Sequence, residues 1–208
     1  MEIYKLGRLV AQKPGPASGS AAGQGSPKPP EPEFEPQRYG NVWMREKVGA
    51  VERLVLGPAR DQCGLIIDLA RPLAEPFGLM YVALYPHFGH PRGRYKAKEP
   101  IGRARMEKFF RDYAEFFELD GRHNIWVVSL DAGGQAAARI IYDHHDVIYA
   151  YGPLDAYVAA AAKRGMAEGK VEVPRDHRHV FNQQFNKDER NLFEEREWVR
   201  FPTEESDY

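Results

Sequence analysis

The feature that most limits the fold of this chain is a series of short apolar segments joined by tight turns between residues 125 and 151. The turns are Asp-Ala-Gly-Gly at 131–134 and Asp-His-His-Asp at 143–146. Turns this short connect antiparallel neighbours, because parallel strands need a crossover of roughly a dozen residues or more. The sequence therefore predicts an antiparallel meander of about four strands. Its expected strands are residues 79–85, 125–130, 136–142 and 147–151.

An aromatic helix is expected beside this meander. Between Ile101 and Leu119, large apolar residues recur three and four positions apart, which is the period of one helix face. This row consists of Met106, Phe109, Phe110, Tyr113, Phe116 and Phe117. Weaker patterns predict short flanking helices at 44–55, 59–70, 154–163 and 187–198. The fold class is therefore α+β, with the meander packed by the aromatic amphipathic helix.

A change in composition divides the chain. Residues 12–38 hold seven of the sixteen prolines and show no apolar period. Such a segment cannot bury enough surface to offset the entropy lost on ordering. We therefore expect a flexible linker at 12–38, a single α+β domain at 39–200 and an acidic, frayed tail at 201–208. Residues 1–11 form a short N-terminal segment and a candidate edge strand.

Charge and cysteine content exclude several classes of protein. The formal net charge is −1 and there is one cysteine. A lone cysteine rules out an internal disulfide framework, a cysteine-based zinc site and an iron–sulfur cluster held by one chain. No stretch approaches the ~20 apolar residues of a membrane span, so we expect a cytoplasmic protein without a membrane partner. Phosphate-loop, dinucleotide and nucleophile-elbow motifs are absent, so we assign no catalytic residue and expect no organic cofactor.

Two histidine pairs are the candidate metal ligands. His144 and His145 occupy the Asp-His-His-Asp turn, and His177 and His179 form an H-x-H pair. In an extended segment, H-x-H places both imidazoles on one side, as metal ligation requires. The flanking carboxylates of Asp143 and Asp146 are the candidate oxygen ligands or orienting groups. If the two segments meet in space, they predict a site for a divalent transition metal. The alternative is ordinary hydrophilic turn chemistry.

A local basic run is the second candidate site. Between Pro91 and Arg111 there are eight cations and two acids, although the whole chain is nearly neutral. Such a run suits an acidic protein surface, and its alternative is a solvated face beside a helix. No recognition-helix or RNA-binding aromatic motif accompanies it, so nucleic acid is not expected as a partner. The expected partner-binding residues are Arg92, Arg94, Tyr95, Lys96, Lys98, Arg103 and Arg105.

Two functional hypotheses follow from these patterns. The first is a non-enzymatic protein-interaction domain of bacterial type, for which a toxin-neutralising immunity protein is one physically sensible form. The local excess of positive charge between Pro91 and Arg111 would speed association with an acidic protein partner. The second is a metal-dependent hydrolase or nuclease built on the histidine and aspartate residues of the two histidine segments. The sequence favours the first hypothesis because no catalytic motif is present.

Overall fold

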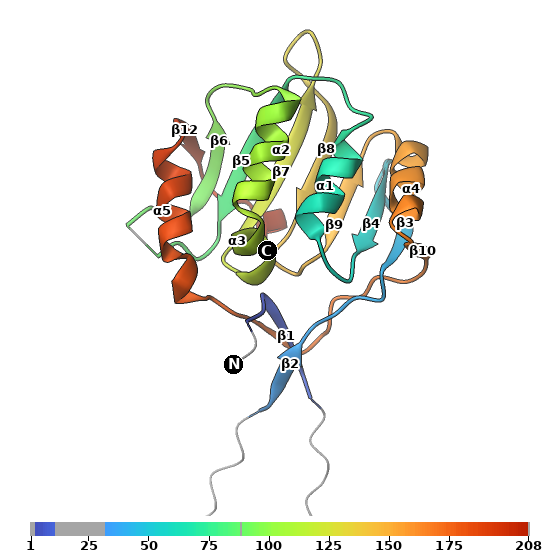
Figure 1. The fold of residues 1–208 in the computed structure, drawn as a ribbon, viewed down its shortest axis with the longest axis vertical. Coiled ribbons are helices and arrows are strands. Elements are labelled where there is room, and N and C mark those ends of the chain that lie inside the picture. Colours follow the sequence, from blue (N-terminus) through green and yellow to red (C-terminus); the bar gives the residue numbers. More distant parts are fainter. Residues whose placement is uncertain (1–2, 11–31, 88, 208) are drawn as a thin grey trace, which may run out of the picture.

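A computed structural model describes residues 3–10, 32–87 and 89–207 of the chain. Its body is a nine-stranded sheet in the spatial order β10-β3-β4-β9-β8-β7-β5-β6-β12 (Figure 1). The strands are β3 (Val42–Val48), β4 (Val51–Gly57), β5 (Phe77–Ala83), β6 (Gly93–Ala97), β7 (His123–Leu130), β8 (Ala136–Tyr142), β9 (Ile148–Tyr151), β10 (Ala167–Glu168) and β12 (Trp198–Phe201). All neighbours in this sheet are antiparallel except β10 and β3.

The mixed α+β class is confirmed, but the expected size of the sheet is wrong. The four predicted strands are neighbours in the order β9-β8-β7-β5, within a sheet of nine rather than about four strands. The predicted helix over 44–55 is also wrong, because these residues form the β3–β4 hairpin. Val48 pairs with Val51 across a two-residue turn in which Gly49 has a φ of 61°. Glycine adopts this left-handed conformation without a side-chain clash, which allows the chain to reverse there.

Helices cover one face of the sheet (Figure 1). They are α1 (Gln62–Ala70), α2 (Arg103–Asp112), α3 (Ala114–Leu119) and α4 (Leu154–Lys163), with α5 (Asn186–Glu194) at one end. The predicted burial of the aromatic row is confirmed: Phe110 and Phe117, for example, are fully buried. The helix expected over residues 101–119 is interrupted at Tyr113, where φ and ψ are −106° and 13°. No helix in the described residues is long and apolar enough to cross a bilayer.

A small second sheet lies below the nine-stranded sheet in Figure 1. Its strands are β11 (His177–His179), β1 (Leu6–Leu9) and β2 (Phe34–Pro36), in the order β11-β1-β2. The expected N-terminal segment thus supplies the central strand of this sheet. Most of the linker expected at 12–38, residues 12–31, lies outside the described residues. In the expected tail, β12 ends at Phe201 and Asp207 is buried.

Candidate functional site: a histidine cluster between two sheets

The turn between β8 and β9 presents two of the histidines. Asp143 organises this turn, because its Oδ1 accepts the backbone N–H groups of His145 and Val147 at 3.0 and 3.1 Å. The Asp143 N–H in turn donates to the Val147 carbonyl at 3.0 Å. Asp146 completes the reversal with a φ of 66°, a conformation that aspartate tolerates better than most residues. The Asp-His-His-Asp sequence therefore fixes a tight turn and holds both imidazoles at the ends of strands β8 and β9 of the large sheet.

The other two histidines come from β11. This strand pairs antiparallel with β1, where His179 faces Leu6 and His177 faces Arg8. Beyond the strand, Val180 donates to the Lys5 carbonyl, and its own carbonyl accepts the Gly121 N–H, both at 2.9 Å. These bonds attach β11 to the loop between α3 and β7. As expected for H-x-H in an extended segment, the two rings lie near each other, with centroids 5.1 Å apart.

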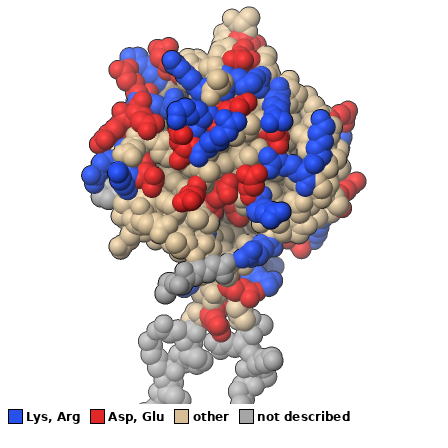
Figure 2. All heavy atoms as spheres, in the orientation of Figure 1, with Lys and Arg blue, Asp and Glu red and all other residues tan. Residues whose placement is uncertain are grey.

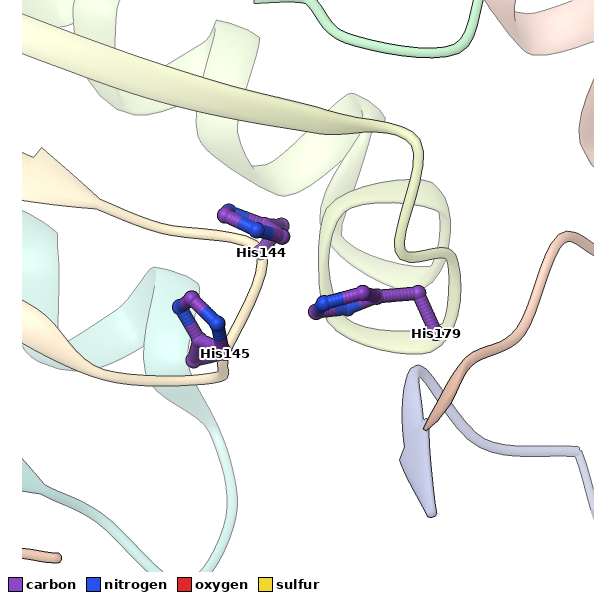
Figure 3. Close-up of side chains that lie close together, drawn as sticks. All are labelled: His144, His145 and His179. Atoms are coloured by element: carbon purple, nitrogen blue, oxygen red, sulfur yellow. The ribbon is translucent and has the colours of Figure 1, made fainter. Parts of the chain in front are cut away.

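The two sheets bring the histidines together (Figure 3). His144 and His145 approach from the β8–β9 turn, and His179 points toward them from the opposite side. One candidate ligand atom from each of these three residues lies within 4.8 Å of the other two. His177 flanks the cluster, with its ring centroid 5.1 Å from those of His145 and His179. The structure therefore satisfies the condition, set by the sequence, that the two histidine segments meet in space.

Fixed hydrogen-bond acceptors orient three of the four rings. The Nδ1 atoms of His144 and His145 lie 3.0 Å from Asn124 Oδ1 and Asp143 Oδ2, and that of His177 lies 2.6 Å from the Pro174 carbonyl. A carbonyl and a carboxylate can only accept, and Asn124 uses its amide N–H to donate to the Asp207 carbonyl. The proton of each neutral ring is therefore on Nδ1. Each Nε2 then carries a lone pair directed away from its orienting group.

The surroundings of His144 and His179 favour their neutral imidazole forms. His144 is 4% exposed, and burial together with the neighbouring His145 lowers its pKa to about 3. Burial also lowers the pKa of His179 to about 4, with His145 and His177 contributing. The Nδ1 of His179 is buried and has no hydrogen-bond partner in the described part of the chain. Neutral, lone-pair-bearing nitrogens held close together in partly dry surroundings are the donor set that a transition metal ion requires.

The two aspartates of the turn play different parts. Burial alone would raise the pKa of Asp143, but the hydrogen bonds that it accepts from the His145 ring and the Val147 N–H help to hold that pKa below its usual value. Asp143 is therefore ionised and orients His145. Asp146 is turned inward, where one oxygen accepts the Tyr142 hydroxyl and the other accepts the Gln62 amide at 3.0 Å. Of the six residues predicted as metal ligands, Asp146 thus has both oxygens engaged away from the cluster.

Several residues of the site were not predicted from the sequence. Asn124 orients His144 from the neighbouring strand, and the Pro174 carbonyl orients His177. Lys5 is buried near the charges of Asp143 and Asp146, and its Nζ donates to the Phe117 carbonyl at 3.0 Å and lies over the Tyr142 ring. Burial lowers the pKa of Lys5. Lys5 directly precedes β1, and its local sequence carries no signal for this role.

The residues expected to bind a partner occupy several places on the molecule. Tyr95 is buried, and Arg103 donates to the carbonyls of Ala70 and Leu73 at 2.9 and 2.6 Å. Arg94 pairs with Asp207, Lys98 pairs with Glu197, and Arg92 donates to the Leu84 carbonyl, whereas Lys96 and Arg105 are exposed. Figure 2 shows Lys and Arg interspersed with Asp and Glu over the helix-covered face. The basic run therefore does not form one uninterrupted cationic patch on that face.

Comparison with known proteins finds no matching family model, no matching curated protein and no matching solved structure. The site is therefore interpreted from its own geometry and chemistry.

Proposed function

We propose that this protein binds one divalent transition metal ion through His144, His145 and His179, and that it uses the metal for hydrolysis. The observation that supports the proposal is the set of acceptors around the rings. The Asn124 amide and the Asp143 carboxylate fix two of the proposed ligands, His144 and His145, with the Nε2 lone pair available, and the Pro174 carbonyl fixes the neighbouring His177 in the same way. Metal-ligating histidines almost always donate their other ring N–H to such groups. Ordinary turn chemistry does not account for four converging rings from two different sheets.

Zinc is the metal that this donor set favours. Neutral imidazole suits zinc, copper, iron and nickel, and a site with three histidine ligands leaves one position of a tetrahedral zinc open. Ligands about 2.0–2.1 Å from such an ion lie roughly 3.4 Å from one another. The three candidate atoms lie within 4.8 Å of one another, so the rings would move closer together to reach that spacing. A zinc ion in an open three-histidine site lowers the pKa of its bound water to about 7.

His177 is the candidate general base. Its Nδ1–H is held by the Pro174 carbonyl at 2.6 Å, which leaves Nε2 able to accept a proton. The ring lies beside His145 and His179, so His177 would be the neighbouring group to take a proton from a water held by the ion. In the alternative arrangement His177 closes the site as a fourth ligand, and the metal is then structural.

A cobalt titration distinguishes these arrangements. We expect untagged, metal-free protein to bind one Co²⁺ per chain with the intense visible absorption of a tetrahedral ion, and azide to change that spectrum by entering the open position. The His177→Ala variant is expected to keep the stoichiometry, because three ligands remain. Failure to bind Co²⁺ would refute the site. Insensitivity to azide, with weakened binding in His177→Ala, would refute the hydrolytic proposal in favour of a structural metal.

The interaction-domain hypothesis stays a prediction. Most cations of the segment from Pro91 to Arg111 already have partners: Arg111 pairs with Glu107, Lys108 pairs with Asp112, and Lys98 pairs with Glu197. These pairs reduce the charge that the segment can offer to a second molecule. The histidine cluster is therefore the better-supported basis for a function.

A further inference from the structure

The face of the large sheet opposite the helices carries a second candidate site. Alternate residues of each strand point to this face, and the helices α1 to α4 lie on the other face. The C-terminal 3-10 turn η2 (Glu205–Asp207) covers one part of it, where Asp207 pairs with Arg94 and its carbonyl accepts the Asn124 amide. We call it the open face. Cross-strand register places on it one acidic residue, Glu46, and among its other members Val48, Val51, Arg53, Met80, Arg94, Lys96, Trp126, Val128, Arg139, Tyr149, Tyr151, Val199 and Phe201.

The composition of the open face is that of a protein interface. Cores of interfaces are rich in tyrosine, tryptophan, methionine and arginine and poor in acidic residues. Four of the seven exposed large hydrophobic residues of the described chain lie here, at its two margins: Val48, Val51, Val199 and Phe201, which are 45–53% exposed. The eight strands from β3 to β12 span about 34 Å at the usual strand spacing. That width gives a flat area comparable with one side of a standard interface, roughly 800 Å².

Arginine and aromatic side chains alternate across the centre of this face. The Arg53 guanidinium lies 4.2 Å from the Tyr149 ring centroid, and Arg139 lies 5.3 Å from Trp126 and 6.0 Å from Tyr151. Arg53 is neutralised by Glu46. Arg139, in contrast, has no acidic partner among the described residues, and its Nε is buried without a hydrogen bond.

A hollow beside Arg139 is also lined by a second cation, Lys96, which has no acidic partner in the described part of the chain. Its volume is about 260 Å³, and Met80, Trp126 and Val128 supply apolar lining. Lys96 lines it from β6, with β5 and β7 between it and Arg139 on β8. A cation held at each side of an apolar hollow is complementary to a carboxylate placed between them.

We propose that the open face is a docking surface for an acidic protein, with an aspartate or glutamate side chain of that protein entering the hollow between Arg139 and Lys96. This inference is independent of the metal site, which lies at the β8–β9 turn. A second copy of this chain is disfavoured, because a twofold face-to-face contact would place the unpaired Arg139 side chains near each other. Nucleic acid is disfavoured because the aromatic rings are already stacked by arginine and exposed aliphatic side chains border the face.

The experiment places a photoreactive residue in the hollow. p-Benzoylphenylalanine replaces Val128 in the full chain, produced in the cells from which the protein comes, and irradiation captures whatever occupies the face. The same residue at Lys47, an exposed position on the helix-covered side of β3, is the control. We expect one dominant protein adduct at Val128 that is absent at Lys47, with acidic residues in the crosslinked peptide.

Charge reversal then tests the captured protein. In titrations of the purified pair, Arg139→Glu with Lys96→Glu is expected to weaken binding at least about 30-fold, because both charges lie at the desolvated centre. The matched double reversal Lys47→Glu with Lys163→Glu should change affinity less than about threefold. Circular dichroism and melting temperature verify that both variants fold. The proposal is overturned by no adduct above the Lys47 control, an adduct with nucleic acid or another copy of the chain, or equal affinities of the two double variants.

Discussion

The His145→Ala variant is expected to bind zinc more than about 100-fold more weakly than the unaltered protein. Its Nε2 is the lone-pair donor fixed by Asp143, and loss of an orienting group alone typically costs 10–100-fold in metal affinity. Removing the ligand itself should therefore exceed that range. Competition with a chromophoric zinc chelator at neutral pH measures the change.

Two further variants test whether the loss of zinc affinity is specific to the histidine cluster. Asp143→Asn retains an oxygen for the turn but presents an N–H to His145, so we expect a loss of 10–100-fold with the fold intact. His90→Ala removes a histidine that stacks on Phe193, away from the cluster, and should leave zinc affinity unchanged. Equal affinities in all three variants would show that the cluster does not bind the ion.

The Arg122→Met variant is expected to lose about 3–5 kcal/mol of unfolding free energy, because this is the usual cost of removing one partner of a buried ion pair. Arg122 is fully buried between Asp120 and Glu189, which are also fully buried. Its guanidinium lies 2.7 and 2.9 Å from the two Asp120 oxygens and 3.0 Å from Glu189. Further bonds to Asn186 and the Asn182 carbonyl use the remaining N–H groups. The variant leaves two carboxylates buried without their cation.

Urea unfolding measures this loss, with Arg111→Ala as the control. Arg111 makes an exposed pair with Glu107 one helical turn away, and such pairs contribute about 0.3–0.5 kcal/mol. We expect the two variants to differ by at least about 2.5 kcal/mol. A loss below about 1 kcal/mol in Arg122→Met would mean that the buried network does not attach α5 to the sheet as described.

The fold was predictable from the sequence where local signals agree. Tight turns at 131–134 and 143–146 correctly indicated antiparallel neighbours, and the Phe109–Phe117 row correctly indicated a buried helix face. The β3–β4 hairpin was missed because its apolar residues also match a helical period, and Gly49 was not recognised as the turn. The position of β12 depends on pairing with residues of β6 about one hundred positions away, for which the local sequence carries no signal.

The candidate site was predictable only as far as local sequence signals reach. Histidines in pairs flanked by aspartate are visible in the sequence, and so is the shared side of His177 and His179. The contact between the β8–β9 turn and β11 belongs to the tertiary structure, because it depends on the pairing of β11 with β1. Asn124 and the Pro174 carbonyl act through contacts made only in the folded chain, and nothing in their own neighbourhoods distinguishes them.

The metal content of untagged protein, purified without chelators and measured by elemental mass spectrometry, tests the account most directly. We expect close to one transition metal ion per chain, zinc foremost, in the unaltered protein and less than one-tenth of that in a His144→Ala, His179→Ala double variant that keeps its circular dichroism spectrum. A metal-free native protein that also fails to take up zinc after dialysis against it would contradict the central claim.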